Sequence, residues 1–194
     1  MYFGSSTKNR ELSNLYSCLI EYKGERYNSL EHVYQSLKFK PKQRHRFTVG
    51  GDLGDFDALL MFKQVFYTKK TTEQDVYKKI DYWGKRNCIG IVAKMASNKK
   101  HSKKLGLSYI GVDDDVFYDL LKLKFAIPEF RDLLLDTKDE ELVEFSRFAK
   151  TRPDQEKWGG MIVDGKLYGE NKMGKMIMKT RSYLQTLDLD LLKL

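Results

Sequence analysis

The stretch 12-LSNLYSCLIEYKGERYNSLEHVYQSLKF-39 decides the first part of the fold, because it contains two short strand patterns followed directly by a helix pattern. Apolar and polar residues alternate from Leu19 to Tyr22, which is the period of a half-buried strand. Lys23-Gly24 supplies a turn, and a second strand pattern follows from Glu25 to Tyr27. These residues predict a short antiparallel hairpin.

A helix from Leu30 to about Phe39 is expected after the hairpin. Ser29 is its predicted N-cap, because a serine hydroxyl accepts hydrogen bonds from the free backbone N–H groups of a first turn. Pro41 ends the helix, since the residue before a proline is disfavoured in the helical conformation. At about 100° per residue, one face of this helix carries the predicted core stripe of Leu30, Val33 and Leu37.

A second face of the same helix gathers four polar side chains, those of Glu31, Tyr34, Gln35 and Lys38. Such a set suits glycosyl chemistry, because a carboxylic acid can protonate a leaving nitrogen or activate water. A partly desolvated lysine can attack an anomeric carbon and form a covalent imine. The alternative is an ordinary solvated face, which is the common position of charged residues on a helix.

The rest of the chain predicts more helix than strand. A strand is possible over 141–147, and Asp164-Gly165 in the stretch MIVDGKLY predicts a second hairpin with a type I′ turn. Helices are expected over 58–67, 76–97 with a break near 84–90, 116–125, 128–135 and 171–187. The core stripes predicted for two of them are Val116, Phe117, Leu120, Leu121, Leu123 and Phe125, and Met173, Met176, Ile177, Leu184 and Leu187.

These elements predict an α+β fold that is predominantly helical, in a single domain over residues 1–194 with short antiparallel hairpins. No alternation of strand and helix is visible, which disfavours Rossmann and P-loop folds. The loop 50-GGDLG-54 lacks the GxxxxGK[ST] pattern, so it is a weak candidate for a phosphate cradle.

Composition narrows the class of protein. Hydrophobic residues are 41% and aromatic residues 13% of 194, which argues against disorder. No apolar run reaches the roughly 20 residues of a membrane span, and the N-terminal residues lack the apolar segment of a secretory signal. The two cysteines and three histidines have no metal-ligand spacing. A cytoplasmic protein without metal or cofactor is expected.

The net charge of +8 is modest, and its distribution matters more than its size. Lys38 to Arg46 places basic residues at every second position, and Ser97 to Lys104 holds four lysines and no acidic residue. Both stretches suit a polyanion such as nucleic acid, a dinucleotide or a phosphosugar. The alternative is a pair of solvated loops.

Two clusters nearer the C-terminus are candidates for ligand contact. Trp158-Gly159-Gly160 places an aromatic ring beside exposed backbone, where a base could stack, although a core tryptophan at a turn is equally compatible. In the second cluster Asn171 is expected to cap the last helix and Arg181 could clamp a phosphate, with Gly169 and Gly174 between them in the same stretch. The alternative is a helix cap and a surface arginine.

The sequence resembles the YbiA-like, or NADAR, family over about Phe3 to Leu184. The opening stretch matches an "SN" pair, a hairpin and an "S-x-E-H-x-x-Q-x-x-K-F" helix. The later motifs follow in order: 93-AKMAS-97, 120-LLKLKF-125, 142-LVEFS-146, Trp158-Gly159, and 169-GENKMGKMIMKTR-181. Five motifs in the right order are more specific than any one of them.

The resemblance implies a YbiA-like domain with N-glycosidase activity that removes ADP-ribose from guanine in nucleic acid or nucleotides. Carried over by position, Glu31 is the acid and Lys38 the amine. The other site residues implied are Asn14, Tyr34 and Gln35 around the ribose, Trp158 and Gly159 over the ring, and Asn171, Gly174 and Arg181.

This sequence departs from the family pattern at several positions. Lys94 stands where many members have an arginine, and Tyr109 where a tryptophan is usual. The acidic residue that usually lies three before the Trp-Gly tryptophan is displaced, which leaves Asp154 as a candidate. The segment 41–90 is longer than in compact members and is read as an extended basic and glycine-rich insertion.

Two other functions stay open. The first is cleavage of phosphoribosylamino-pyrimidine intermediates of riboflavin synthesis, and the second is a non-catalytic module that binds ADP-ribose or NAD. Retention of both Glu31 and Lys38 favours an enzyme, because a binding module needs no amine beside the anomeric carbon. The expected partners are an ADP-ribosylated nucleic acid or nucleotide and an ADP-ribosyltransferase counterpart, with no membrane and a monomeric protein.

Overall fold

The computed structural model describes residues 1–191, with side chains described to position 187. The chain divides into two compact units. The terminal unit joins Met1–Ser13 to Phe117–Leu194, and the central unit is Asn14–Val116. Each unit has its own core and is described separately below.

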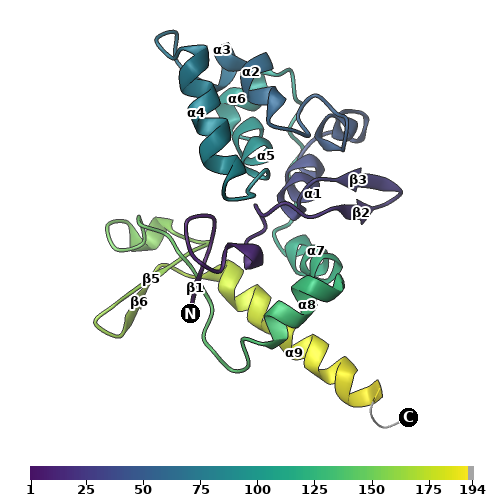
Figure 1. Cartoon of the computed structure of the whole chain (residues 1–194), viewed down its shortest axis with the longest axis vertical. Coiled ribbons are helices and arrows are strands. Elements are labelled where there is room, and N and C mark those ends of the chain that lie inside the picture. Colours follow the sequence, from purple (N-terminus) through teal and green to yellow (C-terminus); the bar gives the residue numbers. More distant parts are fainter. Residues whose placement is uncertain (192–194) are drawn as a thin grey trace. The chain divides into compact units, whose positions relative to one another are not determined.

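The central unit is built around one buried helix, α1. Its elements are β2 (Ile20–Tyr22), β3 (Glu25–Tyr27), α1 (Leu30–Leu37), a 3₁₀ helix (Pro41–Phe47), α2 (Asp57–Met61), α3 (Lys63–Phe66), α4 (Glu73–Gly84), α5 (Ile91–Ala96) and α6 (Lys99–Lys104) (Figure 1). The hairpin β2–β3, the 3₁₀ helix and α5 all contact α1. As a result every residue of α1 is buried, so the polar face of this helix is not a solvated one.

The predicted hairpin and helix start are confirmed. Strands β2 and β3 pair antiparallel, with Ile20 opposite Tyr27. The Ser29 side chain accepts a hydrogen bond from the His32 backbone N–H, so it caps α1 as expected. The helix ends at Leu37, slightly earlier than predicted, and Lys38 is its C-cap. Pro41 then opens the 3₁₀ helix at its first turn, where its missing N–H is not needed.

Two features of the segment 41–90 differ from the sequence expectation. The helix expected over 58–67 is broken at Phe62 into α2 and α3, because Phe62 leaves the helical conformation at ψ 35°. The basic run before it is a 3₁₀ helix rather than an open loop.

The glycine-rich loop that follows this 3₁₀ helix closes tightly on it. A Cβ atom at Gly54 would lie 2.0 Å from the Thr48 carbonyl oxygen. Arg46 also holds the loop, since its guanidinium donates to the Asp52 carboxylate at 2.8 Å. The glycines therefore serve chain closure.

The terminal unit combines two helices, a long closing helix and short strand pairs. Its elements are β1 (Tyr2–Phe3), a 3₁₀ helix (Arg10–Leu12), α7 (Val116–Phe125), α8 (Pro128–Leu135), β4 (Val143–Glu144), a second 3₁₀ helix (Pro153–Gln155), β5 (Met161–Val163), β6 (Lys166–Tyr168) and α9 (Lys172–Leu191) (Figure 1). Strands β1 and β4 pair in parallel, whereas β5 and β6 form the predicted hairpin. Asp164 and Gly165 have φ values of 50° and 75°, as a type I′ turn requires.

The two predicted core stripes of this unit are correct only in part. Leu123 of α7 is 37% exposed and Leu187 of α9 is 42% exposed. In α7 the neighbouring Lys124 is fully buried, because its ammonium donates to the carbonyl oxygens of Glu11 and Ser13 at 2.6 and 2.7 Å. In α9 the helix continues past Leu184, which is the last buried apolar side chain that the structure describes.

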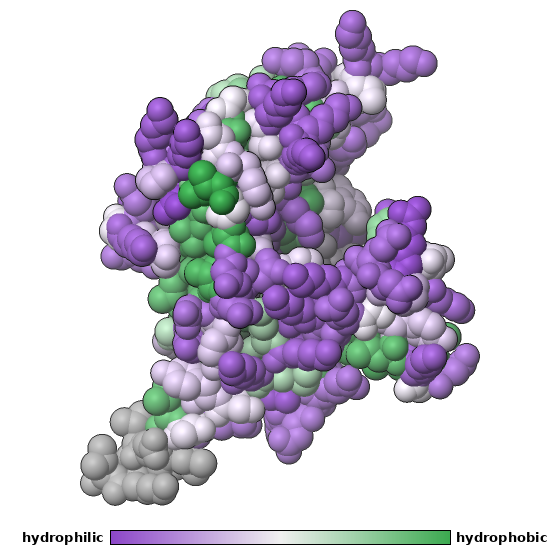
Figure 2. Space-filling model, turned by 180° about the vertical axis from the view of Figure 1, so that it is seen from behind, coloured by the Kyte–Doolittle hydropathy of each residue, from purple (hydrophilic) through white to green (hydrophobic). Residues whose placement is uncertain are grey.

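The observed architecture confirms the predicted α+β class, with helices in the majority and strands only in short pairs. Most side chains on the face shown in Figure 2 are hydrophilic, and the hydrophobic ones gather in a few patches. Within residues 1–191, no helix is both long and apolar enough to cross a membrane.

Candidate functional site

The Glu31 carboxylate is the centre of a buried polar cluster in the central unit. Glu31 is only 2% exposed. One of its oxygens accepts from the side-chain amide of Asn14, and the other accepts from the Gln35 amide at 2.6 Å. Because both amides present their NH₂ groups to the carboxylate, the Asn14 Oδ1 and Gln35 Oε1 atoms face elsewhere. Neither has a hydrogen-bond partner among the described residues.

These two orphaned oxygens need an explanation, because a buried acceptor without a donor costs about 1–3 kcal/mol. A ligand that carries hydroxyl groups would supply the missing donors. The cluster is therefore a carboxylate with two acceptors beside it that can still take a donor.

Tight backbone packing holds Glu31 in place. Its backbone N–H donates to the Asn14 carbonyl oxygen at 3.0 Å, so the chain before β2 and the start of α1 are fastened together. Gly90, at the start of α5, packs directly against this junction. A Cβ atom at position 90 would lie 2.8 Å from the Leu15 Cα and 3.0 Å from the Glu31 Cβ, so only glycine fits.

Lys38 lies at the C-terminal end of α1 and is partly buried. Its Nζ atom is 4.4 Å from the centre of the Tyr34 ring. In the described part of the chain it has no hydrogen-bond or ion-pair partner. Burial lowers the pKa of this amine, the nearby Lys94 lowers it further, and the charges of Glu31 and Asp114 act in the opposite direction. Lys38 is thus biased toward the neutral, nucleophilic form.

Tyr34 is fixed by Asp114, a residue that the sequence did not single out as part of the site. The Tyr34 hydroxyl donates to the Asp114 carboxylate at 2.8 Å. Burial and then this hydrogen bond raise the pKa of the Tyr34 phenol, so it stays a neutral donor. The ring under the Lys38 ammonium is therefore held in one position. A run of three aspartates gave no signal that one of them would reach α1.

A pocket of about 490 Å³ opens beside Lys38. Its lining residues are Lys38, Ser97, Lys99, Ser102 and Tyr109. Tyr109 is 64% exposed and packs edge-on against Phe39 with ring centres 6.0 Å apart. Exposed Lys94 lies at the end of α5. The pocket is cationic, with one exposed aromatic ring, and Glu31 is not among its lining residues.

The two polar side chains predicted near the C-terminus serve the backbone of the terminal unit. Asn171 is 1% exposed, and its side chain donates to the Leu142 carbonyl and accepts from the Glu144 N–H, rather than from the first turn of α9. Arg181 is also buried, and its Nη1 donates to the Thr137 hydroxyl at 2.6 Å and to a backbone carbonyl. Both side chains thus already bond to the fold, and their contact with a ligand stays a prediction.

The glycines of the terminal unit allow close packing. A Cβ atom at Gly174 would lie 2.1 Å from the Leu142 carbonyl oxygen, and one at Gly159 would lie 2.7 Å from that of Glu144. Trp158 is partly buried and packs on Phe117, with ring centres 5.5 Å apart.

Two acidic residues precede Trp158, and the structure gives them different surroundings. Asp154 is exposed in a 3₁₀ helix. Glu156, which the sequence reasoning passed over, accepts instead from the Gly159 N–H at 3.1 Å and from the Ser146 hydroxyl. Its position two residues before the Trp-Gly pair is the sequence feature that could have identified it.

The predicted site residues thus fall into two groups. The central unit brings together Asn14, Glu31, Tyr34, Gln35, Lys38, Lys94 and Tyr109, and the terminal unit holds Asp154, Trp158, Gly159, Asn171, Gly174 and Arg181. Among the described residues no group of three or more His, Cys, Asp or Glu side chains could hold a metal ion.

Comparison with known proteins gives one match of fold. The NMR structure of the E. coli protein YbiA is similar to this chain with a TM-score of 0.55 and 20% sequence identity, over 97% of this chain and 86% of that one. This likeness shows a YbiA-like fold. A scan of protein-family models and a search of curated proteins found no match.

Proposed function

We propose that the protein is an N-glycosidase that removes ADP-ribose from ADP-ribosylated guanine in nucleic acid or nucleotides. The observation that carries the proposal is that α1 and its C-cap bring together Glu31, a buried carboxylate held by two amides, and Lys38, a partly buried amine whose pKa is lowered by burial. The resemblance of the motifs to YbiA-like proteins supplies the substrate class. The likeness to E. coli YbiA supports a YbiA-like fold.

The reaction would begin at the anomeric carbon of the ribose. The bond from this carbon to the guanine nitrogen breaks, its electron pair stays with the nitrogen, and a proton delivered through Glu31 makes the base a neutral leaving group. The lone pair of Lys38 Nζ forms a new bond to the same carbon. Opening of the sugar ring converts this adduct to an imine.

Hydrolysis would then complete the cycle. Water adds to the imine carbon, with Glu31 accepting a proton, and the carbon–nitrogen bond to Lys38 breaks. Free ADP-ribose leaves and the amine is regenerated. In sum one water is consumed for each glycosidic bond cleaved, so the reaction needs no oxidant or reductant.

The surroundings of the pair suit the rest of such a substrate. The orphaned oxygens of Asn14 and Gln35 can accept hydrogen bonds from ribose hydroxyls. Lys94 and Lys99 offer positive charge for a pyrophosphate, and Tyr109 offers an exposed ring on which a base can stack. Tyr34, fixed by Asp114, positions the Lys38 amine.

The test is to trap the imine. The protein is incubated with ADP-ribosylated guanosine in the presence of borohydride, and peptides are analysed by mass spectrometry. We expect a reduced ADP-ribose adduct on Lys38 and none on a Lys38→Arg variant. Lys40→Arg is the matched control, since Lys40 is exposed two positions further on and should leave the adduct unchanged.

A protein that turns over without any adduct, together with a Lys38→Arg variant that keeps its rate, would leave Lys38 as a phosphate-binding residue only. Tight binding of ADP-ribose without turnover of any ribosylated substrate would instead favour a binding module.

A further inference from the structure

The net positive charge of this protein comes from one segment of the chain. Residues 63–104 contain twelve Lys and Arg and three Asp and Glu, a net charge of +9. The remaining residues contain 23 basic and 24 acidic side chains, a net charge of −1, so this segment accounts for the whole excess of +8. A charge kept only for solubility has no reason to collect in one segment.

The fold spreads these residues over the surface of α3 to α6. Ten of the twelve basic side chains are exposed, at positions 69, 70, 78, 79, 85, 94, 99, 100, 103 and 104. Side chains of α4 and α6 both contact α3 or its C-cap, Tyr67. Lys79 of α4 lies 4.0 Å from the centre of the Tyr67 ring, and Lys104 of α6 donates to the Gln64 carbonyl. We call α3 to α6 the basic surface.

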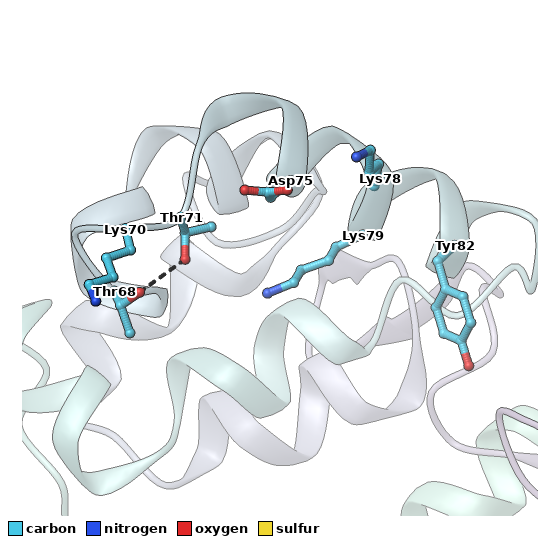
Figure 3. A pocket seen from close by; sticks show the side chains of 7 residues that line it. All are labelled: Thr68, Lys70, Thr71, Asp75, Lys78, Lys79 and Tyr82. Carbon is cyan, nitrogen blue, oxygen red and sulfur yellow. Dashed lines mark hydrogen bonds between the residues drawn. The ribbon is translucent and has the colours of Figure 1, made fainter.

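A hollow of about 530 Å³ lies in the basic surface, away from Glu31 and Lys38 (Figure 3). Lys70, Lys78 and Lys79 line it together with the hydroxyls of Thr68 and Thr71. Asp75 is the one acidic residue of its lining, and it is engaged by the Thr72 hydroxyl and N–H in the capping box of α4, which lowers the pKa of Asp75. Phosphate oxygens would meet both ammonium and hydroxyl donors here.

An exposed aromatic ring lies among these lysines. Tyr82 of α4 is 43% exposed and lines the same hollow as Lys78 and Lys79. The Arg86 guanidinium lies over the Tyr82 ring at 3.6 Å, so this ring already takes part in stacking. Bases stack on such rings whatever their sequence, and lysines that track the backbone add attraction that depends on salt.

We propose that the basic surface binds single-stranded nucleic acid, with its lysines on phosphates and Tyr82 against a base. An exposed ring among cationic side chains favours a single strand, whose bases are free to stack, over a duplex. This binding does not depend on the proposed function. Its consequence for the substrate rests on that function, because the modified guanine would then be part of a strand.

The test measures binding of an unmodified, fluorescein-labelled single-stranded oligonucleotide by anisotropy over a series of salt concentrations. The variant combines Lys70→Gln, Lys78→Gln and Lys100→Gln, three exposed lysines of the basic surface. The matched control combines Lys8→Gln, Lys150→Gln and Lys175→Gln, which removes the same charge from exposed positions of the terminal unit.

We expect the parent to bind with an affinity that falls steeply with salt, with a log–log slope of about −0.7 for each phosphate contacted. The surface variant should bind at least about tenfold more weakly at low salt, with a slope shallower by about 2. The control should bind like the parent. Hydrolysis of ADP-ribosylated guanosine, a mononucleoside substrate, should be unchanged in the surface variant.

Two results would overturn the inference: equal binding and equal slope for the surface variant and the parent, or a parent that binds phosphatidylserine vesicles but no oligonucleotide. A parent that binds the strand yet hydrolyses no ribosylated substrate would leave the basic surface in place and remove the proposed function instead.

Discussion

Lys124 in the terminal unit and Lys38 in the central unit both lose contact with water on folding, completely for Lys124 and partly for Lys38. The groups around the two amines differ. Lys124 is fully buried, and its ammonium satisfies two backbone carbonyl groups. Lys38 has no such acceptor in the described structure, lies over an aromatic ring, and has its pKa lowered by burial. The Lys124 amine is thus bonded to the backbone, whereas among the described residues the Lys38 amine is not, and burial lowers the pKa of Lys38.

The same contrast runs through the other polar side chains. In the terminal unit the buried Asn171 and Arg181 bond to the backbone of their own unit, which fixes loops. In the central unit Glu31, Gln35 and Tyr34 bond to other side chains and leave acceptors unused. Buried polar groups that serve the backbone stabilise a fold, whereas a network with unused acceptors is ready for a ligand. Three experiments sharpen or break this contrast.

The largest effect is expected from Glu31→Gln. This substitution keeps the shape and a carbonyl oxygen for one of the two amides but removes the acid; the other amide must turn over so that its oxygen accepts from the new NH₂. Because general acid–base catalysis typically contributes about 10²–10⁴-fold, hydrolysis of ADP-ribosylated guanosine should fall by that factor. Asn171→Asp, an isosteric change of a buried residue in the terminal unit, is the comparison and should lower thermal stability more than Glu31→Gln does. A Glu31→Gln variant with the parental rate would end the assignment of Glu31 as the acid.

The second experiment exchanges the two lysines for methionine and measures unfolding by denaturant. Lys124→Met leaves the Glu11 and Ser13 carbonyl groups buried without a donor, so we expect a loss of about 2–4 kcal/mol. Lys38→Met removes an amine that makes no hydrogen bond and should leave the free energy of unfolding unchanged within about 0.5 kcal/mol, or raise it. If Lys38→Met is the more destabilising of the two, the contrast between the units is wrong.

The smallest effect concerns pH and His32, which is fully buried beside Ser29, with Nδ1 2.8 Å from the Ser29 Oγ. Burial lowers the pKa of His32 from 6.5 to about 4. Above the unfolded-state value both states are neutral. As pH falls toward about 4, the unfolded chain gains a proton that the folded chain excludes, so stability is lost.

The integrated loss is at most about 3 kcal/mol, complete below the folded pKa. Denaturant unfolding between neutral and acidic pH measures it. A His32→Gln variant should lose this part of the pH dependence, and a His45→Gln variant should keep it. All three histidines lie in the central unit, so hydrogen exchange should report the acid loss there first. Equal slopes for both variants would show that His32 is not the group responsible.

Local patterns predicted much of this structure. The hairpin at β2–β3, the Asp164-Gly165 turn, and the boundaries of α7 and α8 follow from turn chemistry, helix caps and periodicity, which act over a few residues. The grouping of Glu31, Gln35 and Lys38 on one helix face follows in the same way. The single-domain boundaries expected from the sequence, with the insertion over 41–90, stay a prediction.

Contacts between distant segments were not predictable. Nothing near Asp114 in the sequence indicates that it meets Tyr34, and nothing near Lys124 indicates two carbonyl partners more than a hundred positions away. The break at Phe62 and the exposure of Leu123 likewise depend on what packs against each helix. Whether a polar side chain bonds to the backbone or remains open to a ligand depends on tertiary contacts, which a sequence motif alone does not predict.

Gly90 carries a consequence for how this protein can vary. The Glu31 cluster depends on a place where no side chain exists, because any Cβ there would collide with Leu15 and with Glu31 itself. Function could therefore be lost by the addition of one methyl group, which would also lie 2.8 Å from the Ser29 Oγ that caps α1. Such a change, Gly90→Ala, would produce a heat-sensitive allele rather than a dead one if the backbone can yield by a few tenths of an ångström. The most exacting position of the candidate site is thus one that no chemical assay of side chains would find.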